Sequence, residues 1–434
     1  MAMIVKNNMS AVRTLTVLNQ NSSALQKSLT KVASGMKINS AQDDASGYGI
    51  SERMRVRVRS LDQANQNTQN DSALMKTAEG AVSNTIEILK ALKEKAINAA
   101  NDSNTEEDRQ TIQKEVDQFI DQIDDNALVQ FNGKYLVDGS KNNAVSASNT
   151  VLLNQSLATN TDVGSALTAL NNRAGDALEI QSTDKYQVSW VYNGVTSTSS
   201  GLVSDLTLTA LFDMTSVGVG TAQTDATAIP ITKDKFLVDL YTPDKAPGVA
   251  LIATTAGVTS QIAGFTVSIM DAQGNVKKAA NAALDQFKQY QRAENQTGDK
   301  SLNFHVGSEA NVAIKVGIGD MRAEALGLKG NTGERISVTT KENANASINA
   351  IENALAKALD QQTTIGAIEA RLEYTSANLT TSSENVQASE STIRDADMAK
   401  EMTNYTKNNV LLQSAQAMLA QANQNSSAVL SLLQ

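Results

Sequence analysis

Apolar stripes with heptad spacing lie at both ends of the chain and constrain its fold more than any other feature. Near the N-terminus the members of the stripe alternate three and four positions apart: Leu15, Leu18, Ser22, Leu25, Leu29, Val32 and Met36. Near the C-terminus the same rhythm covers Ile365 to Ile393 and, after a break, Met398 to Leu419. This spacing is typical of helices that pack along partner helices. We therefore expect the N- and C-terminal helices to pair as a coiled coil.

The end of the chain carries more apolar surface than one helix pair can bury. Leu430, Leu432 and Leu433 lie within the last five residues, where a free terminus normally frays. Each stripe alone would also fit an ordinary intramolecular core. An isolated pair of helices, however, has too little core to be stable, so we expect other chains to complete it. The predicted packing residues are Leu15, Leu18, Leu25, Leu29, Val32, Met36, Met402, Tyr405, Leu412, Leu419, Leu430 and Leu433.

The middle of the chain has a different composition. All three prolines and the single tryptophan, Trp190, lie within residues 141–290, which are rich in Thr, Ser, Val and Gly. Short apolar runs there predict strands, with Asn193-Gly194 as a hairpin turn. The flanking segments, residues 1–140 and about 300–434, contain no proline and are predicted to be helical. The expected fold is mainly α, with an inserted β-rich domain.

Sequence signals also place individual helices. Ser103 and Thr339 each precede a Glu by three positions, the spacing of a capping box, and predict helices that begin near residues 104 and 340. Residues 43–101 contain no proline and few glycines. As one helix they would extend roughly 85 Å.

Composition argues against several classes of function. A net charge of -9 disfavours a nucleic-acid partner. The one basic run, "ERMRVRVRS", spreads its arginines around a helix, which indicates a solvated or ion-paired surface. Cysteine is absent and His305 is the single histidine, so cysteine chemistry and a His-Glu-x-x-His zinc site are excluded. Adjacent carboxylates such as Asp124 and Asp125 point apart on a helix. We expect no enzymatic activity, no cofactor and no metal.

The opening residues, "MAMIVKNNMSAVRTL", lack the apolar segment of a cleaved signal peptide. No window approaches the ~18 uninterrupted apolar residues of a membrane span. We expect no membrane insertion, and export, if it occurs, without a cleaved signal peptide.

Several long motifs resemble bacterial flagellin. In the N-terminal part they are "SGMKINSAQDDASGYGISERM", "AEGAVSNTIEILKALKEKAINAAND" and "QFNGKYLVDGS". In the C-terminal part they are "VGIGDMRAEALGL", "RLEYTSANLTTSSENVQASESTIRDADMAKEM" and "MLAQANQNSSAVLSLLQ". The resemblance covers roughly the first 140 and the last 130 residues. The middle resembles no family.

The resemblance implies a subunit of the bacterial flagellar filament that polymerises for swimming motility. In that family the terminal helices of many copies surround a central channel, long helices form an outer core and a variable middle domain projects outward. Implied partners are other copies, an export chaperone, and the junction and cap proteins. Export would use the flagellar type III pathway. The implied domains are an inner-core helix (1–42), outer-core half (43–140), variable domain (141–290), second outer-core half (291–396) and inner-core helix (397–434).

Two finer expectations concern single residues. Ser40, Asp43 and Asp44 can cap the long helix, and Gly35 can end the preceding one in a left-handed conformation. The resemblance implies that this stretch is a joint between the inner and outer core layers.

The family is also detected by a Toll-like innate receptor. By resemblance the receptor-contacting Glu is retained as Glu115, whereas the Arg and Leu positions hold Ala91 and Lys95. Weak receptor activation is expected, because a charged anchor is lost and an ammonium replaces an apolar contact.

Two alternatives remain. A hook–filament junction protein shares similar terminal helices, and a surface adhesin would use the middle domain to bind a ligand. The motif "SGMKINSAQDDASGYGI" and the ending "LAQANQNSSAVLSLL" favour the filament subunit.

Overall fold

The computed structural model describes residues 8–158, 161, 164–204, 206–213, 219–220, 248–253 and 255–432. The chain divides into two compact units, and each is described by itself. The first comprises Met1–Thr68, His305–Val312 and Tyr374–Gln434. The second comprises Gln69–Phe304 and Ala313–Glu373.

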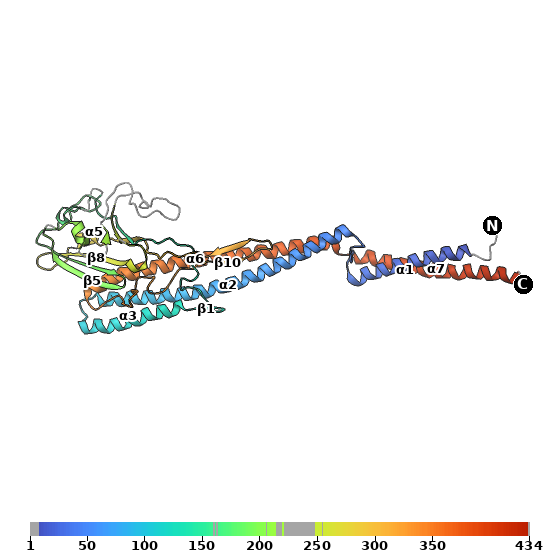
Figure 1. Ribbon diagram of the computed structural model, residues 1–434, viewed down its shortest axis with the longest axis horizontal. Coiled ribbons are helices and arrows are strands. Elements are labelled where there is room, and N and C mark those ends of the chain that lie inside the picture. The colour runs from blue at the N-terminus through green and yellow to red at the C-terminus, as the bar shows by residue number, and fades with distance from the viewer. Residues whose placement is uncertain are drawn as a thin grey trace. The chain divides into compact units, whose positions relative to one another are not determined.

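In the first unit the two ends of the chain form an antiparallel helix pair. Helix α1 (Met9–Ser34) lies beside α7 (Met398–Leu432) in Figure 1. The Asn8 side chain caps α1 by accepting the Ala11 N–H at 3.0 Å. Gly35 ends the helix with φ 70°, and its N–H donates to the Lys31 carbonyl at 2.9 Å. The predicted pairing of terminal helices and the predicted left-handed cap are confirmed.

The first unit also contains the beginning of α2 (Ala45–Ala99) and the end of α6 (Lys341–Arg394). The two helices share a small apolar cluster that includes Leu61 and Leu379. Polar side chains also join the two helices beside this apolar cluster. The Ser383 hydroxyl donates to the Asp62 carboxylate at 2.8 Å, and the Ser376 hydroxyl donates to the Asn65 side chain at 2.6 Å. Helix α2 is one continuous helix of 55 residues, which the proline-free sequence of residues 43–101 permits.

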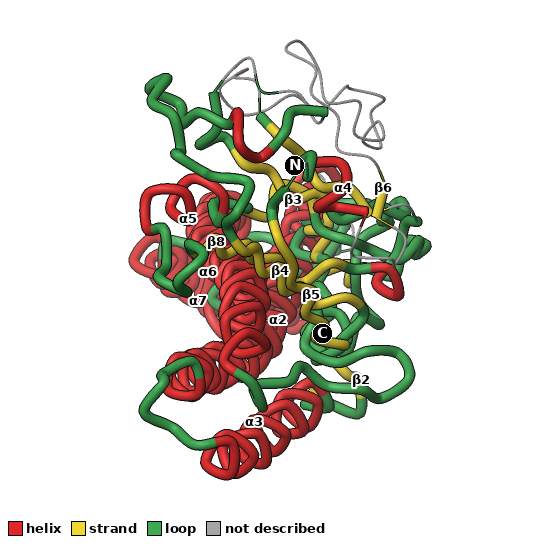
Figure 2. Tube along the Cα trace, turned by 90° about the vertical axis from the view of Figure 1, so that its left-hand side faces the viewer, coloured by secondary structure: helices red, strands yellow, loops and turns green. Residues whose placement is uncertain are grey.

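In the second unit the rest of α2 runs beside α3 (Glu106–Ala127). The Arg109 guanidinium on α3 donates to the Ala99 carbonyl at the end of α2 at 2.8 Å. In Figures 1 and 2, α3 and the strands β4 (Lys185–Tyr192) and β8 (Ile262–Met270) lie on opposite sides of α2.

The predicted helix starts are right, but the predicted capping residues are wrong. Helix α3 is capped by Thr105 and Asp108, whose side chains each bond the other's backbone N–H, instead of by Ser103 and Glu106. At the start of α6 the Thr340 hydroxyl, not that of Thr339, accepts the Asn343 N–H at 3.2 Å. Neighbouring Ser and Thr residues offer equivalent hydroxyl acceptors for a cap, so sequence spacing alone does not select the residue.

The inserted domain packs two antiparallel sheets around one core. Their strand orders are β6-β7-β3-β9 and β5-β4-β8. The core includes Leu152 and Leu251 from the first sheet and Val188 and Phe265 from the second. The remaining bounds are β3 (Val151–Asn154), β5 (Val195–Leu202), β6 (Val219–Gly220), β7 (Val249–Ala253), β9 (Lys288–Gln291), α4 (Leu208–Asp213) and α5 (Lys278–Leu284).

The predicted hairpin turn is confirmed. Asn193 and Gly194 have φ of 47° and 75°, and they join β4 to β5 with Tyr192 opposite Val195. Two positive φ angles are those of the tight turn that Asn-Gly favours.

The sheet β5-β4-β8 also contacts α6. The side-chain amides of Asn349 and Asn353 on α6 donate to backbone carbonyls of β8 at 3.1 and 2.7 Å.

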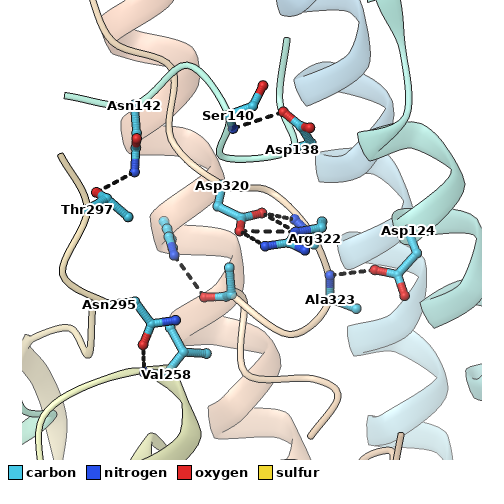
Figure 3. A network of polar contacts seen from close by, with 12 residues as sticks. Asp124, Asp138, Ser140, Asn142, Val258, Asn295, Thr297, Asp320, Arg322 and Ala323 are labelled. Atoms are coloured by element: carbon cyan, nitrogen blue, oxygen red, sulfur yellow. Dashed lines mark hydrogen bonds and ion pairs between the residues drawn. The ribbon is translucent and has the colours of Figure 1, made fainter. Parts of the chain in front are cut away.

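The prediction of helix from about residue 300 is wrong for residues 300–340. That segment contains β10 (Leu302–His305), β11 (Ala313–Val316) and a series of turns. Its turns are fixed by polar contacts: the Asp320 carboxylate binds the Arg322 guanidinium with two oxygens, and Asp124 on α3 accepts the Ala323 N–H at 2.9 Å (Figure 3). Likewise, α3 is followed by a hairpin, β1 (Gln130–Phe131) and β2 (Lys134–Tyr135). Absence of proline permits a helix but does not specify one.

Candidate functional site: the terminal helix pair and its joint

The predicted stripe residues are not all turned toward the partner helix. Leu15 and Leu29 of α1 are 47% and 51% exposed, and Met402 of α7 is 47% exposed. Most of the other stripe residues are half-buried: Leu18, Leu25, Val32, Met36, Tyr405, Leu412 and Leu419. Leu430 and Leu433 lie outside the residues whose side chains the structure describes. A single helix pair therefore leaves part of each stripe in contact with solvent.

Further large apolar side chains of the pair are exposed, although the heptad pattern does not include most of them. They are Met9, Val12, Val17, Met398, Val410, Leu411 and Met418. A concentration of exposed apolar side chains on one pair of helices is typical of an interaction site. Sequence reasoning missed these residues because it sought one stripe per helix, whereas both helices carry apolar side chains around most of their circumference.

The seam between α1 and α7 is narrow and partly polar. Asn8 and Asn21 donate their side-chain amides to the carbonyls of Ala422 and Leu411 at 3.1 and 3.2 Å. The Asn408 amide donates to the Ser28 hydroxyl at 3.0 Å. Polar groups at a helix seam fix the register of a pair at some cost in stability.

The segment between α1 and α2 is held by its carboxylates. Asp43 accepts the N–H groups of Asn39 and Ser40, both at 3.1 Å, and the Ser40 hydroxyl at 3.3 Å. Partial burial raises the pKa of the Asp43 carboxyl, but these hydrogen bonds outweigh it and lower the pKa below its ordinary value. Ser40 and Asp43 therefore form one capped turn.

Asp44 begins α2. Its side chain accepts the N–H groups of Ser46 and Gly47, both at 3.0 Å. A Cβ at Gly47 would lie 2.6 Å from the Asp44 carboxylate and 2.7 Å from the buried Ile38 side chain. The turn consequently packs tightly against the first turn of α2.

Arg394, which sequence reasoning did not single out, anchors the joint. Its side chain is only 7% exposed and donates to Glu52 at 2.6 Å. Its Nε atom lies 3.2 Å from the Met36 sulfur, and the guanidinium lies 5.5 Å from the centre of the Tyr48 ring. The hydrogen bond from Arg394 is the main cause that lowers the pKa of the Glu52 carboxyl. The only sequence signal is that Arg394 directly follows the last member of a stripe.

Backbone pairing joins the same segments. Met36 and Asp395 form an antiparallel bridge. The Lys37 N–H donates to the Arg394 carbonyl at 2.7 Å, and the Ala396 N–H donates to the Gly35 carbonyl at 2.9 Å. The joint therefore holds together residues more than 350 positions apart in the chain.

Glu115, the predicted receptor contact, lies on α3 and forms an ion pair with Lys95 of α2. The predicted joint residues and Glu115 therefore belong to separate sites in different units.

The described part of the chain contains no group of three or more His, Asp or Glu side chains placed to hold a metal ion. Among the helices described there, none is both long and apolar enough to cross a membrane. His305 is exposed at the end of β10.

Two protein-family models match the chain. The model of the bacterial flagellin N-terminal helical region matches residues 5–142. The model of the bacterial flagellin C-terminal helical region matches residues 348–433. Together they cover α1–α3, nearly all of α6, and α7.

Curated relatives match nearly the whole chain. A flagellin of Clostridium tyrobutyricum is 33% identical over 425 residues, which are 97% of this chain and 99% of the relative. A flagellin of Bacillus subtilis strain 168 is 28% identical over 451 residues, covering 99% of this chain and 100% of the relative. Flagellin B of Vibrio anguillarum is 30% identical over 435 residues, with 100% of both chains covered.

Solved structures match at lower identity. The flagellar hook-associated protein 3 of Legionella pneumophila has 18% identity and a TM-score of 0.34, covering 78% of this chain and 97% of that one. FliC of Burkholderia pseudomallei has 18% identity and a TM-score of 0.25, and the match covers 69% of this chain and 99% of that one.

Proposed function

This chain belongs to the bacterial flagellins and is a structural subunit of the flagellar filament, and from that premise we propose that copies polymerise by burying the exposed apolar faces of α1 and α7 against one another. The observation that carries the proposal is the exposure of Leu15, Leu29 and Met402 on a pair whose own seam is narrow. Because each of these side chains is already about half covered, burying the remainder contributes roughly 1 kcal/mol per side chain. In an open helical array the same contact repeats at every subunit.

The half-buried stripe residues Leu18, Leu25, Val32, Met36, Tyr405, Leu412 and Leu419 belong to the same proposed interface. Leu430 and Leu433 extend it to the end of the chain. In this proposal residues 1–42 and 397–434 form the inner core of the filament. Residues 43–140 and 291–396 form the outer core, and residues 141–290 project outward. Ser40, Asp43 and Asp44 form the joint between the two core layers.

The test is assembly by purified protein in a precipitant, measured by sedimentation and negative-stain electron microscopy. Leu15→Ser combined with Leu29→Ser is expected to abolish filaments, and so is a chain that ends at Met418. Leu202→Ser is the matched control, because Leu202 is 59% exposed but lies on β5 of the inserted domain. Normal filaments from the double variant would refute the proposed interface.

Further partners and the export route follow from the family. In this proposal the subunit leaves the cell by the flagellar type III pathway without cleavage, and it engages an export chaperone, the cap protein and the junction protein. Its role is structural and not enzymatic. Deleting the flagellar export apparatus in the source bacterium should keep the protein in the cell, and detection of normal amounts in the medium would overturn this route.

Recognition by a Toll-like innate receptor is proposed to be weak. Glu115 is already paired with the Lys95 ammonium, so a receptor that uses this carboxylate has to displace its partner. In a reporter-cell assay, the double variant Ala91→Arg with Lys95→Leu is expected to be at least ~10-fold more potent than the natural chain. Equal potency of the two proteins would contradict this explanation.

A further inference from the structure

The break between α6 and α7 contains neither proline nor glycine, although Asp397 within it caps the start of α7. Helix α6 ends at Arg394 and α7 begins at Met398. The intervening residues are Asp, Ala and Asp, and no glycine or proline occurs anywhere in residues 367–432. Sharp interruptions of helices almost always coincide with proline, glycine or an inserted group. Here the inserted group is another part of the chain.

The N-terminal segment occupies the backbone groups that a continuous helix would use. In such a helix the Arg394 carbonyl would accept an N–H from Met398, and the Ala396 N–H would donate to Thr392. In the structure the carbonyl instead accepts the Lys37 N–H, and the Ala396 N–H donates to Gly35. Docking of residues 35–38 thus replaces two helical hydrogen bonds with two bridge hydrogen bonds.

The apolar stripes explain why the break matters. Ile393 ends the stripe of α6, and Met398 begins that of α7 five positions later. At 100° per residue, a continuous helix would turn the second stripe about 140° away from the first. With the break in place, α6 packs on α2 through Leu379 while α7 pairs separately with α1.

We propose that the joint is a two-state device, with Arg394 as the residue that latches it. In the docked state Arg394 binds Glu52 and contacts Met36 and Tyr48, so the break and the α1–α7 pairing persist. In the undocked state residues 341–432 form one uninterrupted helix whose α7 stripe faces away from α1. Asp397 supports the docked state by capping α7, since it accepts the Ala399 N–H at 3.0 Å. This goes beyond polymerisation and concerns how a single chain presents its interface.

A disulfide trap reports docking, because the natural chain has no cysteine. The two hydrogen bonds of the bridge are donated by Lys37 and Ala396, the residues that follow Met36 and Asp395. Met36 and Asp395 themselves therefore form a non-hydrogen-bonded antiparallel pair. Cα atoms of such a pair are about 4.5 Å apart, within reach of a disulfide. The parent variant is full-length Met36→Cys with Asp395→Cys, which lacks the Met36 contact of Arg394 but keeps those with Glu52 and Tyr48. Adding Glu52→Gln or Arg394→Met to this parent is expected to slow disulfide formation in a glutathione buffer about tenfold or more.

Arg55→Met is the matched control. Arg55 also contacts Glu52, at 3.3 Å, but it lies on the same helix and does not bridge the joint. The rate should stay at the parent value in this variant. Exchanging the charges, Glu52→Arg with Arg394→Glu, should restore much of the rate that either single change removes. An unchanged rate with Arg394→Met, or an equal loss with Arg55→Met, overturns the latch.

The conformation of the undocked state is tested on the cysteine-free chain. Carbon-13 labels on aspartate report the backbone of Asp395 and Asp397 through their Cα chemical shifts. Arg394→Met is expected to move both shifts to helical values. Extended or random-coil shifts in the variant would overturn the two-state device. Filament formation by the natural chain, scored separately by electron microscopy, tests the proposed function independently.

Discussion

At the scale of single residues, the joint shows how one buried charge can organise a segment that its neighbours do not specify. Arg394 is buried, whereas its partner Glu52 remains partly exposed, so removing Glu52 would leave the guanidinium without its carboxylate. Sequence could predict the caps at Asp44 and Gly35, since caps follow local rules. The prediction that Ser40 and Asp43 also cap α2 is wrong, because Asp43 bonds Asn39 and Ser40 in the preceding turn. Sequence could not predict Arg394, because that role depends on residues more than 340 positions away.

A second residue-scale consequence concerns Asp71 on α2, because burial raises the pKa of its carboxyl to about 6. A folded-state pKa above the ordinary 3.8 means that the native chain binds this proton more tightly than the unfolded chain. Stability from this group therefore rises as pH falls through about 6, and it is lost as pH rises through that value.

Asp71→Asn is accordingly expected to stabilise the soluble chain at pH 8 and to have little effect at pH 4.5. Because Asp71 is only partly buried, we expect a gain of about 1 kcal/mol in the free energy of unfolding. Thermal unfolding at both pH values provides the measurement, with Asp125→Asn on the exposed face of α3 as control. An equal effect of Asp71→Asn at the two pH values would contradict the assignment.

At the scale of elements, the long helices could be predicted because their periodicity extends over many turns. The starts of α3 and α6 were predicted to within two residues, and the proline-free run of residues 43–101 permitted the continuous helix α2. The turns of residues 300–340 could not be predicted, because contacts such as that between Ala323 and Asp124 fix them. The apolar stripes identified the terminal pair as an interface. They did not show which members face the partner helix and which face outward.

The start of α2 offers a matched pair of substitutions. Gly47→Ala should destabilise the chain by about 1 to 3 kcal/mol, because the new Cβ would collide with Ile38 and Asp44. Gly49→Ala should stabilise it by roughly 0.5 to 1 kcal/mol, since a Cβ there meets nothing within 4 Å in the same helix. Urea unfolding of the two variants distinguishes them. A stabilising Gly47→Ala would show that this turn is looser than described.

At the scale of the whole molecule, the helices carry an inserted domain that has its own core and also contacts α6. Its two sheets share their own core, and β3 and β9 carry the chain into and out of it. Sequence predicted its β-rich class from proline, Thr and Ser content. It did not predict the strand order, because short strands with weak alternation leave pairing open.

Excision of the domain should spare polymerisation. Val151 and Gln291 lie opposite each other on β3 and β9, so removing residues 151–291 leaves ends that an Asn-Gly turn can join. The shortened chain is expected to form filaments of smaller diameter in electron micrographs. Loss of assembly, with helical content retained in circular dichroism, would mean that the inserted domain takes part in the subunit contacts.

The central claim is that exposed apolar side chains of α1 and α7 hold the filament together, and a helical reconstruction of the filament by electron cryomicroscopy tests it most directly. We predict that Leu15, Leu29 and Met402 lie within about 4.5 Å of apolar atoms from neighbouring copies. A map in which these three side chains face solvent, with subunits joined only through α2, α3 and α6, would contradict the account.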